Sequence, residues 1–206
     1  LLSIPRDTPV ATGNGGLMKI NSVYAGGGAD GMQRLAARLN SLLGFPVDGY
    51  VLVDLEAFKK TVDLVGGVDF DVPEDMNYDD PYQDLHIHFK AGLQHLNGQQ
   101  AMEVVRFRHN NDNTGYSGQQ DLGRIGTQQD FLMTVAKQLL QIGNITKINE
   151  FAKIFEEYVD TNLTIGNIVR FGEEFLKVKP ENINFHVIPA DYNGSIRMCS
   201  YCIIHV

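Results

Sequence analysis

The order of helical and extended patterns along the chain constrains its fold most. Apolar residues that recur every three or four positions predict helices, and runs rich in β-branched residues predict strands. The expected elements are a strand ending near residue 4, a helix over 30–43, a strand over 47–54, a helix over 56–65, a strand over 68–72, helices over 97–106, 121–140, 145–158 and 165–178, and strands over 183–188 and 201–206. This order predicts an α/β domain with a central mixed β-sheet flanked by helices on both faces, in which the strand over 47–54 is mostly buried.

The length and charge of the chain limit its class. With 206 residues it is expected to form one domain with a substantial core. Its formal net charge of -8 argues against a general polyanion binder, so no nucleic-acid partner is expected. A transcription factor is disfavoured as well, because no helix-turn-helix pattern stands out. No run of about 18 apolar residues occurs, so no membrane span is predicted within these residues.

The first eight residues bring opposite charges to the predicted end of a strand. Pro5 fixes its own φ angle and favours an extended Ile4, so the apolar strand before it should end here. Arg6 and Asp7 follow at once. Strand ends of α/β sheets often bind ligands, although such a pair alone is also typical of a surface ion pair. Its interpretation therefore depends on the charges found elsewhere in the chain.

A second group of cations follows the helix that is predicted from about residue 97. If the end of that helix is extended, Arg106 and Arg108 share one face, because side chains alternate along a strand. Two guanidinium groups that face one way favour an anion between them, and arginine suits bidentate phosphate contacts. The polar loop over 109–120 has the length and composition of a mobile loop over a site.

The helix over 121–140 carries the third group. Asp121 is expected to cap it, and Arg124 and Gln128 lie four residues apart on one face near its N-terminal end, where the helix dipole favours an anion. A capped helix with an exposed Arg and Gln explains the same residues without a ligand. In an acidic chain with only 17 Lys and Arg, however, three such groups together predict a phosphate or pyrophosphate site.

Two residue pairs are of types that occur in metal-binding or redox sites. Cys199 and Cys202 lie in an apolar run expected to be a strand, where residues three apart point to opposite faces, so structural cysteines are expected rather than a disulfide. His86 and His88 share one face of a predicted strand, but no third metal ligand is expected nearby. The acidic segment over 73–85 lacks the ligand spacing of a calcium site and is expected to be a solvated loop.

Seven motifs occur in a characteristic order. They are S-I-P-R-D-T at 3–8, K-I-N-x-x-Y at 19–24, D-G-Y-V-x-V-D at 48–54, L-V-G-G-V at 64–68, G-L-Q-x-L-N-G-x-x-A at 92–101, R-F-R-H at 106–109, and D-L-G-R with Q-Q at 121–129. By these motifs the chain resembles the LytR-CpsA-Psr family of bacterial cell-wall assembly. The resemblance is strong over about 1–140 and looser beyond.

The resemblance implies a phosphotransferase at the extracellular face of the bacterial cytoplasmic membrane. Members of the family move a glycopolymer, such as teichoic acid or capsular polysaccharide, from a polyprenyl-diphosphate carrier to peptidoglycan. Two alternatives stay open: hydrolysis of polyprenyl diphosphate by the same site, and a carrier-binding or regulatory module without turnover. Apolar faces of the last two helices would line a tunnel for the polyprenyl tail, although core packing explains the same faces.

The resemblance also assigns roles to residues. Those expected to bind the diphosphate are Arg6, Lys19, Arg106, Arg108, Arg124 and Gln128. Those expected to be catalytic are Asp7, Arg108, Asp121 and Arg124. Asp7 would hold Mg²⁺, and Asp121 would orient arginines or assist deprotonation of the acceptor hydroxyl. This division suits phosphoryl transfer, which depends on positioning and on neutralising the phosphate oxygens.

The chain departs from the family pattern in three ways. Met18 stands where many members have a second metal-binding Asp, and Thr127 stands where many have the Arg of an R-Q-Q motif. The chain also begins at what looks like an internal strand, whereas family domains usually have an earlier strand and, before it, a membrane-spanning helix. The expectation is therefore a catalytic domain that lacks its first N-terminal strand or strands and whose membrane anchor is absent from this chain.

Overall fold

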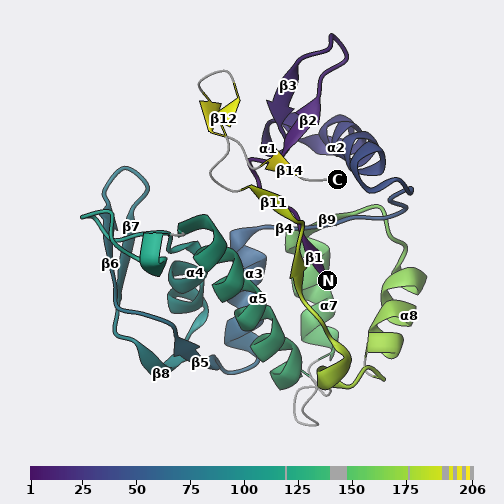
Figure 1. Ribbon diagram of the computed structural model, residues 1–206. Coiled ribbons are helices and arrows are strands. Elements are labelled where there is room, and N and C mark those ends of the chain that lie inside the picture. Colours follow the sequence, from purple (N-terminus) through teal and green to yellow (C-terminus); the bar gives the residue numbers. More distant parts are fainter. Residues whose placement is uncertain are drawn as a thin grey trace. The chain divides into compact units, whose positions relative to one another are not determined.

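The computed structural model describes residues 1–118, 120–139, 148–175, 177–191, 195–196, 199–200 and 203–204 (Figure 1). Contacts divide the chain into two compact units, each with its own apolar core. Unit 1 comprises Leu1–Tyr50 with Asn184–Val206, and unit 2 comprises Val51–Ile183. Both contain helices and strands, so the expected mixed α/β class is confirmed. The expectation of a single domain stays a prediction.

Unit 1 is built from a hairpin, two helices and several short strands. Its elements are β1 (Leu2–Ser3), β2 (Pro9–Ala11), β3 (Leu17–Lys19), α1 (Ile20–Val23), α2 (Gly28–Leu43), β10 (His186–Val187), β11 (Ala190–Asp191), β12 (Ser195–Ile196), β13 (Cys199–Ser200) and β14 (Ile203–Ile204). β1 pairs in parallel with β10, and the β2–β3 hairpin packs beside α1 and α2 (Figure 1). Val10, Ile20 and Val23 form the buried centre of this packing.

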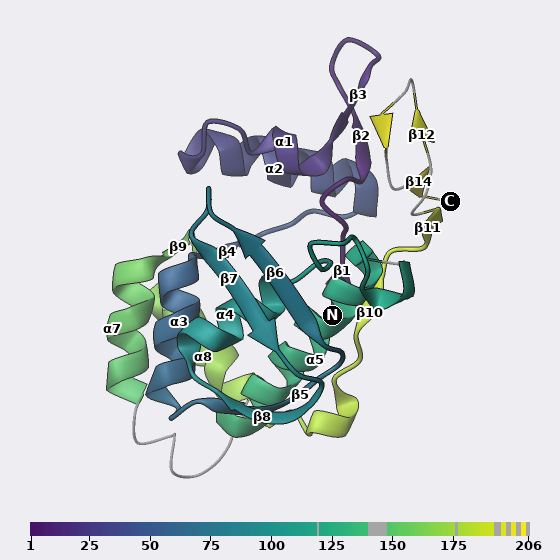
Figure 2. The ribbon, with the colours of Figure 1, turned by 90° about the vertical axis from the view of Figure 1, so that its left-hand side faces the viewer.

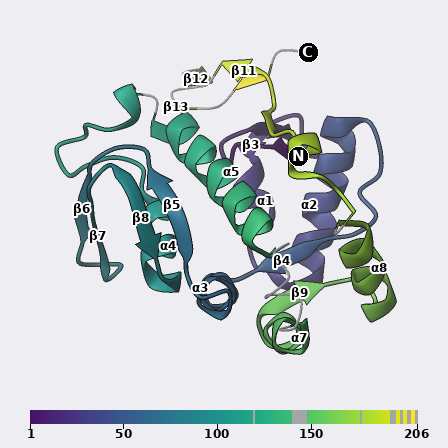
Figure 3. The same ribbon diagram turned by 90° about the horizontal axis from the view of Figure 1, so that it is seen from below.

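Unit 2 packs two antiparallel strand pairs against helices. Its elements are β4 (Val51–Val53), α3 (Leu55–Leu64), β5 (Val68–Val72), β6 (Met76–Asp80), β7 (Leu85–Phe89), β8 (Gly92–Leu96), α4 (Gly98–Arg106), the 3₁₀ turn η1 (Tyr116–Gly118), α5 (Gln120–Leu139), α7 (Ile148–Tyr158), β9 (Val159–Thr161), α8 (Ile165–Phe175) and η2 (Pro180–Asn182). The pairs β5–β8 and β6–β7 are antiparallel, and these four strands lie together on one side of α4 and α5 (Figure 3).

The core of unit 2 lies between those strands and helices. Along β5 the buried Val68, Phe70 and Val72 alternate with exposed aspartates, as the sequence predicts. Phe131 of α5 is fully buried, and its ring centroid lies 5.1 Å from that of Phe70 and 5.5 Å from that of Phe58 on α3. Burying apolar side chains on one face of each element is the main source of stability in such a layered fold.

Helix boundaries follow the sequence closely. α2 ends where Gly44 adopts a left-handed φ of 77°, the conformation that favours glycine at a helix C-terminus. α4 begins after Asn97, whose side chain accepts a hydrogen bond from the Gln100 backbone in a capping box. Arg106 is the last residue of this helix, so the extended stretch begins only at Phe107.

Several strand expectations are wrong. Over 47–54 only Val51–Val53 forms a strand, which pairs with β9, and its three apolar side chains are exposed rather than mostly buried. The acidic segment over 73–85 is not all loop, because Met76–Asp80 forms β6 against β7. Of the final run, Cys199–Ser200 forms β13 and Ile203–Ile204 forms β14, while Cys202 lies outside the described residues. Within the described residues the ladders are two-stranded, one parallel and six antiparallel.

Candidate functional site

The residues expected to bind a diphosphate come from both units. Arg6, Asp7 and Lys19 belong to unit 1, and those of the later motifs belong to unit 2. Within each unit, these residues are positioned by the helices and strands of that unit.

In unit 1 a tight turn presents Arg6 and Asp7 directly after β1. The Thr8 backbone N–H donates to the Pro5 carbonyl at 3.0 Å and closes the turn, while the Asn21 N–H donates to the Arg6 carbonyl at 3.2 Å. The second bond ties the turn to α1. The strand end and the charged pair are thus where the sequence predicts them, and backbone contacts fix their position.

Lys19 completes a cluster of three charges around this turn. Its Nζ lies 3.1 Å from Asp7 Oδ1, and the Arg6 Nε lies 3.6 Å from the same oxygen. The Asp7 side chain is largely shielded from solvent, whereas that of Arg6 is more than half exposed. Two cations held by one shielded carboxylate form a site of net positive charge, which suits an anionic ligand.

Met18 lies beside this cluster and packs into the apolar core of unit 1. It is half-buried against the cluster formed by Val10, Ile20 and Val23. The same side chain borders a cavity of about 390 Å³ that is also lined by Val23 and Arg34. Apolar packing therefore accounts for a thioether at this position.

In unit 2 the two arginines of R-F-R-H are set by the aromatic residue between them. Phe107 is 1% exposed and packs edge-on against Tyr116, with ring centroids 5.6 Å apart. Arg106 closes α4, and its Nη2 donates to Gln83 Oε1 at 2.8 Å. Because the chain leaves the helix at Phe107, strand alternation does not align Arg106 with Arg108. Arg108 is half-buried in the extended stretch that follows.

The N-terminal half of α5 lies against this segment. Gln128 Nε2 donates to the Val105 carbonyl at 3.0 Å, and so satisfies a carbonyl at the end of α4 that has no helical partner. Arg124 lies one turn before Gln128 and is half-buried. Asp121 is the second residue of α5 rather than its cap, and its side chain is outside the described part of the structure. The described contact gives Gln128 a positioning role, and its contact with a diphosphate stays a prediction.

A buried polar contact fixes the end of the loop over 109–120. Tyr116 Oη lies 2.9 Å from Thr127 Oγ1, which also donates to the Gly123 carbonyl at 3.1 Å. Burial raises the pKa of Tyr116, so its hydroxyl stays protonated and able to donate. A Cβ on Gly123 would lie 2.0 Å from the Tyr116 ring, which explains the glycine of D-L-G-R. Sequence reasoning missed this contact.

Two asparagines hold the start of the same loop on β6. Asn111 Oδ1 accepts from the Asp79 N–H at 2.7 Å, and its Nδ2 donates to the Asp79 carbonyl at 3.0 Å. Asn110 Oδ1 accepts from the Asn77 N–H at 2.6 Å. These side chains satisfy backbone groups at the edge of β6, as a neighbouring strand would. The segment directly after Arg108 is therefore anchored to β6.

The unit 1 residues can be tested for a fit to Mg²⁺. Asp7 offers one carboxylate, and the buried hydroxyl of Thr8, next in the chain, has no hydrogen-bond partner within the described residues. Magnesium in phosphoryl-transfer sites is often held by one or two carboxylates together with substrate phosphates and water. A single carboxylate with a spare hydroxyl fits that pattern, although Lys19 and Arg6 already neutralise Asp7.

Comparison with known proteins identifies the family. The sequence model of the LytR_cpsA_psr family matches residues 1–205. The chain belongs to this family. The LytR_cpsA_psr assignment confirms the resemblance carried by the seven motifs. Among the described residues, no helix is both long and apolar enough to cross a membrane.

Two curated relatives and one solved structure illustrate the match. The polyisoprenyl-teichoic acid–peptidoglycan teichoic acid transferase TagV of Bacillus subtilis is 37% identical over 169 residues, which cover 80% of this chain and 41% of TagV. The regulatory protein MsrR of Staphylococcus aureus is 29% identical over 177 residues, which cover 85% of this chain and 50% of MsrR. The crystal structure of B. subtilis TagV has a TM-score of 0.75 at 31% identity, covering 98% of this chain and 75% of that chain. The chain thus spans half or less of the length of these curated relatives.

Proposed function

We propose that this LytR_cpsA_psr domain is a phosphotransferase that moves an anionic glycopolymer from a polyprenyl-diphosphate carrier to peptidoglycan. The observation that carries the proposal is the buried Phe107 ring, which anchors the residue directly before Arg108. The chain belongs to a family whose member TagV is named a teichoic acid transferase. The proposed place of action is the extracellular face of the bacterial cytoplasmic membrane.

In the proposed reaction a hydroxyl oxygen of peptidoglycan attacks the phosphorus that bears the glycan. A new P–O bond forms to the acceptor, the bond from that phosphorus to the bridging oxygen breaks, and polyprenyl phosphate leaves. Arg108 and Arg124 neutralise the charge that grows on the phosphate oxygens, and Arg6, Lys19 and Arg106 help to bind the diphosphate. Asp121 takes the acceptor proton or orients the arginines.

Mg²⁺ is proposed as the cofactor, with Asp7 as its protein ligand and Thr8 as a second oxygen donor. The ion would supply further neutralisation of the phosphate oxygens when bound. Asp7 also has a role of its own, because it holds Lys19 and Arg6 together beside the end of β1. This arrangement supports diphosphate binding through direct cations as well as through a metal.

The two departures from the family pattern do not argue for a module without turnover. Met18 fills an apolar neighbourhood in unit 1, and Thr127 forms a hydrogen bond with Tyr116. Both residues have structural tasks in this chain, so neither is merely a lost catalytic group. The name of MsrR, a regulatory protein, keeps the regulatory alternative worth a direct test.

The test measures transfer of a radiolabelled, lipid-linked teichoic acid precursor to purified peptidoglycan by the full-length protein with Mg²⁺. We expect peptidoglycan-bound label in the wild type, and about 10²- to 10³-fold less in Arg108→Ala, the loss typical of removing one transition-state donor. Arg170→Ala removes an exposed arginine of α8 and serves as the matched control. It should keep wild-type activity.

Three results would change the assignment. Equal release of free phosphorylated glycan with and without peptidoglycan would favour hydrolysis over transfer. Binding of the carrier without any turnover in Mg²⁺ would favour a regulatory module. Full activity of Arg108→Ala in a properly folded protein would refute the proposed role of that arginine.

A further inference from the structure

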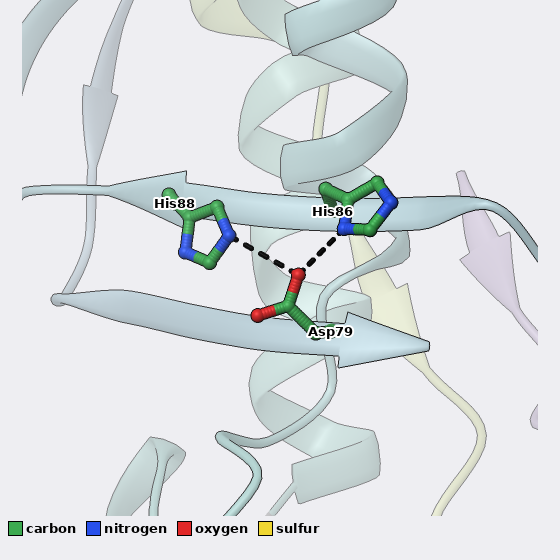
Figure 4. Close-up of side chains that lie close together, drawn as sticks. All are labelled: Asp79, His86 and His88. Carbon is green, nitrogen blue, oxygen red and sulfur yellow. Dashed lines mark hydrogen bonds and ion pairs between the residues drawn. The ribbon is translucent and has the colours of Figure 1, made fainter. Parts of the chain in front are cut away.

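Three metal-ligating side chains meet on the exposed face of the β6–β7 hairpin. In the antiparallel register Asp79 lies opposite His86, and Asn77 lies opposite His88. His86 Nδ1 is 2.6 Å and His88 Nε2 is 3.2 Å from the same atom, Asp79 Oδ1 (Figure 4). Potential ligand atoms of the three residues all lie within 4.8 Å of one another, and no other such trio occurs in the described part of the chain.

The nitrogen of each imidazole that points away from Asp79 also faces an oxygen. His88 Nδ1 is 2.8 Å from Asn77 Oδ1, and His86 Nε2 is 3.6 Å from a carboxylate oxygen of Asp84. Metal-binding histidines usually donate their second N–H to such an oxygen, which fixes the tautomer and leaves the other nitrogen free to coordinate. The Asn77 contact therefore orients the His88 ring as a metal ligand, whereas the 3.6 Å approach of His86 to Asp84 is a longer ion-pair contact.

We propose that Asp79, His86 and His88 form a binding site for a borderline transition-metal ion, best fitted by Zn²⁺. Two imidazole nitrogens and one carboxylate oxygen match the ligands of zinc, with water in the remaining position. Mg²⁺ and Ca²⁺ prefer oxygen ligands and should bind poorly. The inference is independent of the proposed transfer reaction.

The geometry needs only small side-chain movements. Ligand atoms of a tetrahedral zinc site with bonds of about 2.0–2.1 Å lie roughly 3.3 Å apart. The 3.2 Å between His88 Nε2 and Asp79 Oδ1 is close to this spacing, and the 2.6 Å between His86 Nδ1 and Asp79 Oδ1 must lengthen by about 0.7 Å. All three side chains are about half exposed, so they can turn without disturbing the core, and an ion can reach them from solvent. Buried Leu85, Ile87 and Phe89 on the opposite face of β7 hold the strand itself in place.

The hairpin is joined to the segment that follows Arg108. Figure 2 shows β6 and β7 running side by side in front of α4. Asn111 brackets the backbone of Asp79 with two hydrogen bonds, and Asn110 binds the backbone of Asn77. A bound ion that links β6 to β7 would therefore stiffen the anchor of this loop. The expected role of the ion is structural.

The same unit contains a natural control. Asp69 on β5 and His95 on β8 also form a cross-strand pair, with His95 Nδ1 2.7 Å from Asp69 Oδ1. The other nitrogen of His95 faces the Gly66 carbonyl at 3.0 Å, and no second histidine joins the pair within the described residues. Loss of His95 therefore removes a similar surface contact without removing a proposed metal ligand.

The experiment titrates ZnCl₂ into EDTA-treated protein at about pH 7.5 by calorimetry. We expect one equivalent to bind to the wild type and to His95→Gln alike. His86→Gln and His88→Gln should each bind more than about 100-fold more weakly, and Asn77→Ala about 10- to 100-fold more weakly, as expected for an outer contact. Excess Mg²⁺ should not displace the ion. A cooperative thermal transition in EDTA should show that each variant is folded.

A second readout uses Co²⁺ as a spectroscopic probe of coordination. A visible absorption band should appear in the wild type and in His95→Gln, and should be absent in His88→Gln. Absence of saturable binding, unchanged binding in His88→Gln, or loss of binding in His95→Gln would each overturn the proposal. Displacement of Zn²⁺ by Mg²⁺ would overturn the choice of ligand class.

Discussion

Replacing Phe107 by alanine tests whether a buried ring positions the arginine on which the proposed chemistry depends. The Phe107 side chain is 1% exposed in the core of unit 2, while the residues on either side of it, Arg106 and Arg108, are half-buried. Removing the ring leaves the charges intact and removes only their anchor. Any loss of activity that exceeds the loss of folded protein then measures the effect of misplacing these arginines.

The expected cost follows from what the ring contacts. Truncating a fully buried phenylalanine to alanine destabilises a protein by about 3–5 kcal/mol, because transfer and cavity terms add. The edge contact with the Tyr116 ring, at 5.6 Å, contributes about 0.5–1.5 kcal/mol beyond area burial. A loss near 4 kcal/mol is a large share of the roughly 5–15 kcal/mol of a typical domain. Phe107→Leu, with an expected loss of about 1–2 kcal/mol, keeps the test usable if the alanine variant unfolds.

The assay pairs two core substitutions of the same type. Phe70→Ala removes a ring of similar burial from β5, where its described aromatic contact is Phe131 and no arginine adjoins it in sequence. Denaturant unfolding gives the free energy of each variant, and transfer is measured at a temperature where both are folded. We expect Phe107→Ala to lose about 10²-fold in kcat/KM, the effect of misplacing a reacting group by about 1 Å, and Phe70→Ala to stay near wild type.

Two outcomes would refute this reasoning. Equal activity of the two folded variants would mean that the ring stabilises the core without positioning Arg108. A free-energy loss below about 1 kcal/mol in Phe107→Ala would mean that the ring is not packed as described. Either result would remove the structural support for an arginine clamp at the end of α4.

Two further predictions concern stability. Asn97→Ala removes the capping box of α4 and should lower the free energy of unfolding by about 1 kcal/mol in urea denaturation; an unchanged midpoint would contradict the cap. The hydrogen bond from Asp69 raises the pKa of His95 above its ordinary 6.5, so the stabilisation by this pair is fully present below the unfolded value and is lost as pH rises through the raised folded pKa. Asp69→Asn should therefore lower the melting temperature more at about pH 5.5 than at about pH 8.5, and equal shifts at both would refute the linkage.

Local patterns in the sequence predict the helices and the alternating strands because the physical causes are local. The periodic apolar residues of α2 and the cap at Asn97 each act within a few positions, and the alternation of Val68, Phe70 and Val72 needs only one buried face. The exposure of β4 could not be predicted from the local sequence. An apolar run is buried only if neighbouring elements cover both faces, and that depends on distant segments.

The candidate site shows the same division. The motifs identify Arg6, Arg106 and Arg108 by residue type, but not what holds them. The contact between Tyr116 and Thr127 joins a loop to a helix eleven positions later, and no periodic signal marks it. The sequence does not identify Asp79 as a partner of His86, because the polar residues of β6 predict a loop. Only the register of the hairpin brings the two residues together.

Thr127 has a structural role in α5. Thr127 is 4% exposed on α5, and its hydroxyl accepts a hydrogen bond from Tyr116 Oη while it donates to the Gly123 carbonyl. An arginine directed to the same buried position would need to desolvate its charge and displace the Tyr116 contact, at a cost of several kcal/mol. Thr127 therefore helps to hold Tyr116, and with it the end of the loop that begins after Arg108. The arginines of the family motifs in unit 2 are Arg106, Arg108 and Arg124, so loss of any one of them should weaken the proposed diphosphate binding.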